Sequence, residues 1–268
     1  MRRIDCRKRE AARKMKMKKI SIVIPTYNEQ ENVGAMTEKL TEIMNTSLPQ
    51  YDYEIIFIDN HSKDGTRKIL RRLCAADKKV KAIFNARNFG QLRSPVHGLK
   101  QAYGDCVIRL NADFQDPPEL IPEFVHKWEE GSKIVIGIKS KTDENFFMSF
   151  VRKKYYKLLR KITDIGHIEN FTGFGLYDRD FVNIVRDIHD PVPYLRGMIA
   201  ELGYDYETIT YERPRRRAGK SKNNFYSLYD YAMVGITSYS KVVMRIATFF
   251  GFGVGVLSLI VALVYFIL

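Results

Sequence analysis

The sequence is poor in residues that cross-link a chain or bind metals through sulfur. Its 268 residues include three cysteines, Cys6, Cys74 and Cys106, which show neither a Cys-x-x-Cys pair nor a zinc-type spacing. This pattern argues against a disulfide framework and a zinc site, and is typical of plain thiols in a reducing compartment. Disorder is not expected either, because 45% of the residues are hydrophobic and can fill a sizeable core.

Charge is absent from one segment, and an apolar run is absent from another. No charged side chain occurs from Ile246 to Leu268, and a helix of that length would reach about 34 Å, enough to cross a bilayer. A buried core helix is the alternative. Residues 1–19 carry ten Lys and Arg against two acids and lack the apolar run of a secretory signal, so they form either an anionic-lipid contact or a disordered tail.

The apolar segment also predicts the orientation of the chain. Lys241 and Arg245 precede it, and every basic segment lies N-terminal to it. The positive-inside rule therefore places residues 1–245 in the cytoplasm, with the chain anchored in the cell (inner) membrane. Because no polar residue follows the span, we expect a truncated chain whose full form continues into a second span.

The net charge of +13 is concentrated in three places. Besides the tail, residues 139–161 carry eight basic side chains against two acids, and residues 213–222 carry six against none, while the remainder of the chain is acidic. This distribution indicates anionic partners at defined positions. By charge alone, nucleic acid, lipid headgroups and phosphorylated substrates all qualify.

Short apolar runs alternate with segments of helical periodicity over the first ~140 residues. Strands are expected at 20–24, 53–58, 80–84, 106–110 and 134–138, with helices at 31–44, after Thr66, at 92–103 and at 118–129. The alternation predicts an α/β fold with a mostly parallel sheet, in which ligands bind at the carboxyl ends of the strands. The loops 25–29, 59–66 and 111–117 all fall there.

Beyond residue 140 the pattern changes. Residues 146–162 mix aromatic and aliphatic side chains with Lys and Arg, which favours an amphipathic helix on a membrane surface, or else a helix packed on the sheet with a solvated basic face. Residues 226–243 are expected to form a second helix that leads into the span, with tyrosines available at the membrane interface.

Oxygen-bearing side chains gather in the loop after the fourth strand. Asn111, Asp113 and Gln115 alternate along it, so they converge on one side and could bind one hard cation such as Mg²⁺ or Mn²⁺. The segment 111–119 could equally be only a turn with a helix start. After the second strand, Asp59 could accept hydrogen bonds from a nucleobase or ribose, or be a turn residue, and 64–66 is more typical of a helix cap than of a ligand contact.

Five ordered motifs together resemble the inverting family-2 nucleotide-sugar glycosyltransferases of GT-A fold. Within that family the sequence is similar to the polyprenyl-phosphate sugar transferases, the group of dolichol-phosphate mannose synthase and the bactoprenol glucosyltransferases. The motifs are Ile22-Val23-Ile24-Pro25-Thr26-Tyr27-Asn28-Glu29, Ile58-Asp59-Asn60 with Ser62, Asp64-Gly65-Thr66, Arg87-Asn88-Phe89-Gly90, and Asn111-Ala112-Asp113-Phe114-Gln115-Asp116-Pro117-Pro118-Glu119. The resemblance covers roughly residues 18–245.

The resemblance implies roles for the residues that match the motifs. Asp113 would be the main metal carboxylate, and Asn111 and Gln115 would be the flanking metal ligands. Asp113, Arg87 and Arg213 would be the catalytic residues, with Arg87 near the donor. The nucleotide-sugar would be held by Pro25, Tyr27, Glu29, Asp59, Asn111, Ala112 and Asp113.

The basic segment 213–222 resembles the family's loop that closes over the diphosphate and the acceptor, although by itself it could be only an exposed charged loop. The residues implied for the acceptor phosphate are Lys139, Arg213, Arg215, Ser221 and Lys222. Three positions depart from the family, because Asn111 and Asn60 stand where Asp is frequent, and Gly175 is matched to a position that often holds Arg.

The expected domains are a basic tail (1–19), a GT-A domain (20–224), a juxtamembrane helix (225–245) and a transmembrane helix (246–268). The expected reaction is inverting, metal-dependent transfer of a sugar from a UDP- or GDP-sugar to a polyprenyl phosphate at the cytoplasmic membrane face, by a chain that assembles as a homo-oligomer and binds no nucleic acid. A noncatalytic nucleotide-sugar-binding scaffold and a transferase with a glycolipid or polysaccharide acceptor are the alternatives. The sequence has no Gln-x-x-Arg-Trp element of processive synthases and no Gly-x-Gly-x-x-Gly after the first strand.

Overall fold

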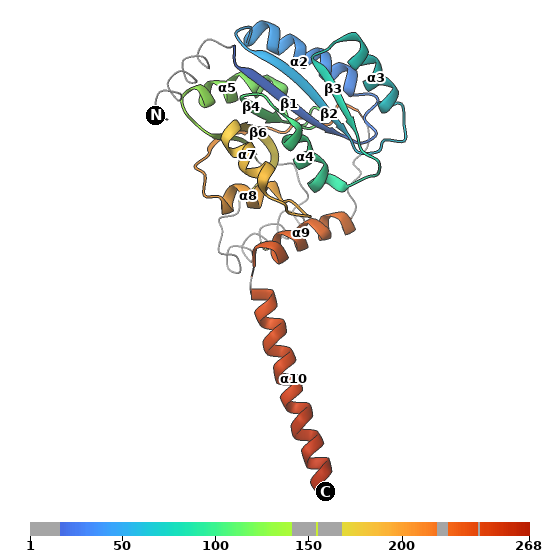
Figure 1. The fold of residues 1–268 in the computed structure, drawn as a ribbon, viewed down its shortest axis with the longest axis vertical. Coiled ribbons are helices and arrows are strands. Elements are labelled where there is room, and N and C mark those ends of the chain that lie inside the picture. Colours follow the sequence, from blue (N-terminus) through green and yellow to red (C-terminus); the bar gives the residue numbers. More distant parts are fainter. Residues whose placement is uncertain (1–16, 141–153, 155–167, 219–224, 241) are drawn as a thin grey trace, which may run out of the picture. The chain divides into compact units, whose positions relative to one another are not determined.

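A computed structural model describes residues 17–140, 154, 168–218, 225–240 and 242–268 (Figure 1). The chain divides into two compact units, one made of residues 1–142 and 170–221 and the other of residues 143–169 and 222–268. The predicted amphipathic helix at 146–162 lies almost wholly outside the described residues, as does the basic tail up to residue 16.

A seven-stranded sheet forms the centre of the first unit, in the order β3-β2-β1-β4-β6-β5-β7. The strands β1, β2, β3 and β4 pair in parallel, as do β5 and β7, whereas β6 is antiparallel to both of its neighbours. The α/β fold with a mostly parallel sheet is therefore confirmed, with one reversed strand. The strands are β1 (Lys19–Thr26), β2 (Asp52–Asp59), β3 (Val80–Phe84), β4 (Cys106–Arg109), β5 (Ile134–Lys139), β6 (Phe171–Asp178) and β7 (Glu207–Tyr211).

Helices cover both faces of this sheet (Figure 1). Helix α2 contacts α3 and α5 on one face, and α4 contacts α7 on the other. The alternation of side chains along β1 explains this arrangement, because Ile22 and Ile24 lie in the core that α2 completes, whereas Val23 faces Gly98 of α4. The helices are α2 (Val33–Ser47), α3 (Thr66–Ala76), α4 (Gly90–Gln101), the short 3₁₀ helix η1 (Pro118–Leu120), α5 (Ile121–Glu129), α7 (Arg179–Asp187) and α8 (Leu195–Glu201).

The second unit contains α9 (Phe225–Tyr239) and α10 (Val242–Ile267), drawn in red shades in Figure 1. The single helix predicted for 226–243 is wrong in one respect, because the helix ends at Tyr239 and a new one begins at Val242. The side chain of Ser240 explains the new start, since its Oγ accepts a hydrogen bond from the Val242 N–H at 3.2 Å. Among the described residues, only Met244–Ile267 of α10 is long and apolar enough to cross a membrane.

Candidate functional site

The loops that follow β1 and β2 are joined side by side by hydrogen bonds. The Asn28 N–H donates to Ser62 Oγ, the Lys63 N–H donates to Asn28 Oδ1, and the Glu29 N–H donates to Thr66 Oγ1, each at 2.8 Å. These contacts arise because parallel neighbours end at the same edge of the sheet, where Thr26 of β1 is in register with Asp59 of β2. Tyr27 lies on the first of these loops, whereas Pro25 is still part of β1, paired with Ile58 of β2, so the loop begins two residues later than predicted; both residues are half-buried.

Asp59 is fully buried at the end of β2 and is held by a partner that the sequence did not reveal. Its Oδ2 lies 2.8 Å from Nε of Arg67 in α3, and its carboxylate also accepts the Ser62 N–H at 3.3 Å. The Arg67 guanidinium offsets the cost of burying this negative charge. Asp64 accepts the Thr66 N–H at 3.0 Å at the start of α3, in agreement with the predicted role of 64–66 at a helix start.

Asn60 joins the end of β2 to the loop that carries Arg87. Its Oδ1 accepts the Phe89 N–H at 2.8 Å, and its Nδ2 donates to Asn88 Oδ1 at 2.7 Å and to the Gly90 carbonyl at 3.3 Å. The backbone donor and the backbone acceptor fix which end of the amide is which. Only an amide can satisfy this arrangement, because an aspartate would supply no donor.

Arg87 itself is exposed, and its guanidinium lies over the Phe89 ring, 4.4 Å from the centroid. The loop that Asn60 holds therefore presents a cation stacked on an aromatic ring. This is consistent with the predicted place of Arg87 near an anionic donor.

The loop after β4 meets the basic segment that follows β7. Asp113, which is only 6% exposed, forms an ion pair between its Oδ2 and Arg216 Nη2 at 2.8 Å, and Gln115 Oε1 accepts a hydrogen bond from Arg213. Burial raises the pKa of Asp113 above its ordinary value, and Arg216 opposes that rise by favouring the carboxylate. The structure thus brings together three residues of the predicted site, Asp113, Gln115 and Arg213, and adds Arg216.

Asn111 lies in the same loop but is turned toward the interior. Its backbone N–H and its Nδ2 both donate to Asp116, at 3.0 and 2.7 Å, and its Oδ1 accepts a hydrogen bond from Arg109 at 3.1 Å. Asp116 is completely buried and also accepts hydrogen bonds from Thr172 and Tyr211, so its carboxylate fixes the shape of the loop. Ala112 is buried in the apolar core, which leaves only its backbone for a ligand.

Two glycines of β6 lie where a side chain would not fit. A Cβ on Gly173, whose φ is +93°, would lie 2.3 Å from Arg109 Nη1, so the absence of a side chain makes space for that guanidinium. A Cβ on Gly175 would lie 2.4 Å from the Val135 carbonyl oxygen. Gly175 is therefore an interior position of the sheet in this chain, where a neighbouring backbone carbonyl leaves no room for an arginine side chain.

The remaining acceptor residues are only partly described. Lys139 ends β5, where its backbone N–H donates to the Asn170 carbonyl at 3.3 Å, and Arg215 is exposed. Ser221 and Lys222 lie outside the described residues, so their predicted contacts with phosphate stay predictions.

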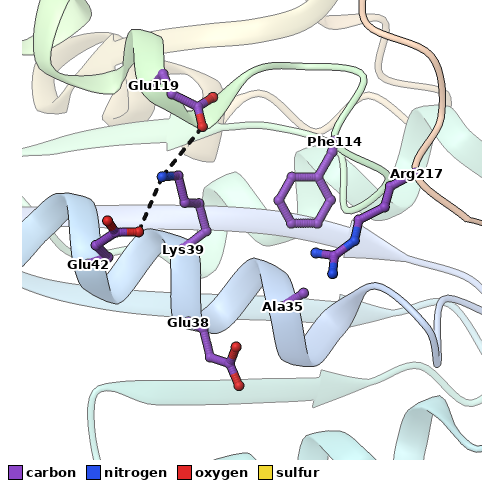
Figure 2. Close-up of a pocket in the computed structure, with 7 residues that line it drawn as sticks. All are labelled: Ala35, Glu38, Lys39, Glu42, Phe114, Glu119 and Arg217. Carbon is purple, nitrogen blue, oxygen red and sulfur yellow. Dashed lines mark hydrogen bonds and ion pairs between the residues drawn. The ribbon is translucent and has the colours of Figure 1, made fainter.

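A cavity of about 280 Å³ borders the Asp113 loop on its α2 side (Figure 2). Figure 2 shows Phe114 facing Arg217, whose guanidinium lies 5.2 Å from the ring centroid. At the other end Lys39 bridges Glu42 and Glu119, at 3.2 and 3.7 Å. The segment 213–217 therefore contacts the loop after β4 both through Asp113 and through Phe114.

Three loops of this edge contain non-glycine residues with left-handed backbone. The φ angles are +54° at Asn28, +65° at His61 and +60° at Phe114. Such angles are uncommon outside glycine, and each loop after β1, β2 and β4 contains one of them.

The candidate metal ligands are one carboxylate and two side-chain amides. Over the ranges that the structure describes, no cluster of three or more His, Cys, Asp or Glu side chains could hold a metal ion. Asp113, Asn111 and Gln115 supply the hard oxygens that Mg²⁺ and Mn²⁺ prefer, with a single negative charge among them.

Comparison with known proteins places the chain among the glycosyltransferases. The model of the family described as "Glycosyl transferase family 2" matches residues 21–186. An uncharacterized glycosyltransferase of Synechocystis sp. is 35% identical over 241 residues, covering 90% of this chain and 75% of that protein. A bactoprenol glucosyl transferase of Shigella phage SfV is 33% identical over 241 residues, covering 90% and 78% respectively.

The solved structures agree with the fold. Mannosyl-3-phosphoglycerate synthase from Rubrobacter xylanophilus is similar with a TM-score of 0.55 at 18% identity, over 92% of this chain and 77% of that one. Glucosyl-3-phosphoglycerate synthase from Mycobacterium tuberculosis, in complex with Mn²⁺, UDP-glucose and phosphoglyceric acid, has a TM-score of 0.51 at 16% identity, over 84% and 78%. Matched over most of its sheet and site loops, the chain belongs to glycosyl transferase family 2 and is an enzyme of GT-A fold rather than a noncatalytic scaffold.

Proposed function

We propose that this glycosyltransferase moves a sugar from a UDP- or GDP-sugar to a polyprenyl phosphate at the cytoplasmic face of a membrane. The observation that carries the proposal is the meeting of the Asp113 loop with the arginines of segment 213–217, which gathers cations at one edge of the sheet. The Shigella phage relative is named for transfer to bactoprenol, and the similarity over 90% of this chain supports the same class of acceptor here.

The residues at this edge fit a divalent cation. Asp113, Gln115 and Asn111 offer oxygen ligands, and a bound Mg²⁺ or Mn²⁺ would supply positive charge to the donor diphosphate as it leaves. Asn111 would have to turn its Oδ1 away from Arg109 to take part. Asp113 is 6% exposed and forms an ion pair with Arg216. It is the only carboxylate among the three candidate ligands, so the metal site depends on it.

The residues that hold the nucleotide come from the ends of β1 and β2 and from the loop after β1. In this proposal Pro25, Tyr27, Glu29 and Asp59 orient the nucleoside, and the hydrogen bonds between the two loops keep these groups at a fixed spacing. Fixed spacing matters because the anomeric carbon must be presented in line with the incoming oxygen.

The chemistry demands little base catalysis. A phosphate monoester is anionic at neutral pH, so one of its oxygens can attack the anomeric carbon without first losing a proton to the protein. The new C–O bond forms while the bond to the nucleoside diphosphate breaks, and the diphosphate leaves with the electron pair. A single displacement of this kind inverts the anomeric centre. Arg87, Arg213 and Arg215, with Lys139 and Lys222, would offset the repulsion between the two anions, and Ser221 would donate a hydrogen bond to the acceptor phosphate.

The membrane assignment rests on α10. Its apolar stretch Met244–Ile267 would be about 36 Å long at 1.5 Å per residue, and its side chains are exposed, as expected of a segment that lies in lipid. A lipid acceptor presented at the headgroup level is consistent with such an anchor.

A donor screen tests the proposal. Full-length chain in membranes is incubated with radiolabelled UDP-, GDP- and dTDP-sugars and undecaprenyl phosphate, with Mn²⁺, with Mg²⁺ or with EDTA, and lipid-extractable label is counted. We expect one nucleotide-sugar to give labelled lipid that requires the metal, and the Asp113→Ala variant to lose at least about 100-fold in rate while inserting normally, because a charge partner of the diphosphate is removed. Near-normal transfer by that variant, or a product with retained anomeric configuration, would contradict the proposal.

A further inference from the structure

Each side chain proposed for the metal already contacts an arginine through one of its oxygens, although Asp113 Oδ1 accepts the Gln115 N–H at 3.2 Å instead. Arg216 contacts Asp113 Oδ2, Arg213 contacts Gln115 Oε1, and Arg109 contacts Asn111 Oδ1. Two of these three arginines belong to the basic segment 213–217 and one belongs to β4. The segment therefore reaches into the metal position itself and does not merely lie near it.

Arg216 is the arginine that most resembles a bound cation. Its guanidinium lies 2.8 Å from Asp113 and 3.9 Å from Glu29, so it bridges the loops after β4 and β1. Only 23% of its side chain is exposed, and the two carboxylates are 8% and 13% exposed. Charge pairs that are this well shielded from water are stronger than exposed ones.

Other contacts hold the same segment against the site. The Arg217 N–H donates to the Asp113 carbonyl at 3.4 Å, the Arg217 guanidinium stacks on Phe114, and the Ala218 carbonyl accepts a hydrogen bond from the buried Asn32 at 3.4 Å. Asn32 also donates to Glu29 at 2.6 Å, which ties this end of the segment to the carboxylate that Arg216 faces. A cation that displaced Arg216 from Asp113 would thus disturb the anchoring of residues 213–218.

We infer that Arg216 is an internal cation that holds segment 213–218 against the Asp113 loop, and that a divalent ion at Asp113 competes with it for Oδ2. The inference rests on the metal of the proposed function. Its consequence is an order of events, since metal and donor would enter first and would release segment 213–218, which the proposed function assigns to the acceptor phosphate. Arg216 is a positioning residue in this scheme, because it acts on segment 213–218 through Asp113.

Mn²⁺ binding to the full-length chain without nucleotide tests this competition. The free Mn²⁺ is measured by electron paramagnetic resonance for wild type, Arg216→Gln, Arg216→Lys and Arg215→Gln. We expect Arg216→Gln to bind Mn²⁺ about tenfold tighter, since a charged hydrogen bond no longer competes. Arg216→Lys should stay near wild type. Arg215→Gln removes the same charge from an exposed neighbour and should change the affinity less than about twofold.

Cleavage by trypsin after Arg217, followed by mass spectrometry, gives a second readout that does not involve activity. Mn²⁺ should speed this cleavage in wild type, and Arg216→Gln should be cleaved fast without Mn²⁺. Equal Mn²⁺ affinity of wild type and Arg216→Gln, or equal shifts in Arg216→Gln and Arg215→Gln, would overturn the competition while leaving the proposed function intact. Absence of Mn²⁺ binding in all variants, with transfer unaffected by EDTA, would overturn both.

Discussion

At the scale of single residues, Asn60 holds the loop 86–90 through hydrogen bonds that its place in the sequence does not indicate. By sequence it is only a substitution for a frequent Asp. In the structure its amide accepts from one backbone group and donates to another on the loop that presents Arg87. The loop is therefore adapted to asparagine at this position, and its shape depends on that amide.

We predict that Asn60→Asp destabilises the 86–90 loop. The change removes two donated hydrogen bonds and places a carboxylate against the Asn88 and Gly90 oxygens, which should cost about 1–3 kcal/mol. Faster hydrogen exchange at the Phe89 and Gly90 amides and a raised KM for the donor would be measured. Asn60→Ala is the control for the added charge, because it loses the two donated bonds and also the accepted Phe89 N–H, but places no carboxylate against the Asn88 and Gly90 oxygens. Equal exchange rates in Asn60→Asp and wild type would refute the role.

Some positions of the candidate site follow from the order of the strands in the sequence, and others depend on the path of the folded chain. Asp113, Gln115 and Glu29 come after apolar strands, and the parallel order of those strands brings them to one edge, so their location could be predicted from the sequence while their roles stay predictions. Arg216 was not singled out because it stands in a run of similar arginines, and only the path of the chain after β7 selects it. The tight packing at Gly175 was not visible for a related reason, since a sequence does not show that a neighbouring carbonyl leaves no space for a side chain.

At the scale of elements, Asp178 joins three of them. It ends β6, and its carboxylate accepts hydrogen bonds from the indole N–H of Trp128 in α5 at 2.7 Å, from Lys133 at 3.0 Å, and from the Asp180 N–H at the start of α7 at 2.9 Å. Burial alone would raise the pKa of Asp178, but these donors outweigh it and lower the pKa below its ordinary value.

We predict that Asp178→Asn lowers the free energy of unfolding by about 1–3 kcal/mol, because an amide N–H then faces groups that are themselves donors. Trp128 is the only tryptophan, so thermal unfolding followed by its fluorescence reports on this site directly. A carboxylate with a lowered pKa stabilises the fold above its unfolded pKa, and this contribution is lost as the pH falls through the folded value. The gap between wild type and variant should therefore be full at neutral pH and close below about pH 4.

The matched control is Asp180→Asn, two residues along the chain. Its carboxylate is 61% exposed and contacts Lys133 at 2.8 Å, so the change should cost less than about 1 kcal/mol. If the two variants unfold at the same temperature, Asp178 does not have the joining role described above.

Elements with strong periodicity were predictable, and those shaped by their neighbours were not. The first five strands and the helices between them are confirmed, because apolar runs and helical spacing decide them locally. The strand β6 was missed, since Phe171–Asp178 contains two glycines and runs antiparallel between β4 and β5, a placement that only the finished sheet specifies. The break after Tyr239 depends on one serine hydroxyl, which hydrophobic periodicity does not detect.

At the scale of the whole molecule, we predict that the sheet domain is exposed to the cytoplasm. Basic residues flank α10 on its N-terminal side, and their transfer across the membrane is disfavoured. In a variant with Cys6→Ser and Cys74→Ser, a cysteine introduced at Tyr103, which is 72% exposed, should not react with an impermeant maleimide in intact spheroplasts. It should react fully once the spheroplasts are lysed, and this reaction is the control. The remaining native cysteine, Cys106, is buried, so the label reports on position 103. Labelling before lysis would reverse the assigned topology.

The left-handed backbone at Asn28, His61 and Phe114 has a consequence for how this enzyme would evolve. Each residue holds a conformation that glycine adopts without steric cost, so these loops give up some folding stability to keep their shape. Replacement by glycine would relieve the local strain and at the same time loosen the curvature of the three loops that the proposed function assigns to the donor. Selection in the laboratory for heat tolerance alone would then tend to accumulate glycine at these positions, and the surviving variants would fold well but hold their donor poorly.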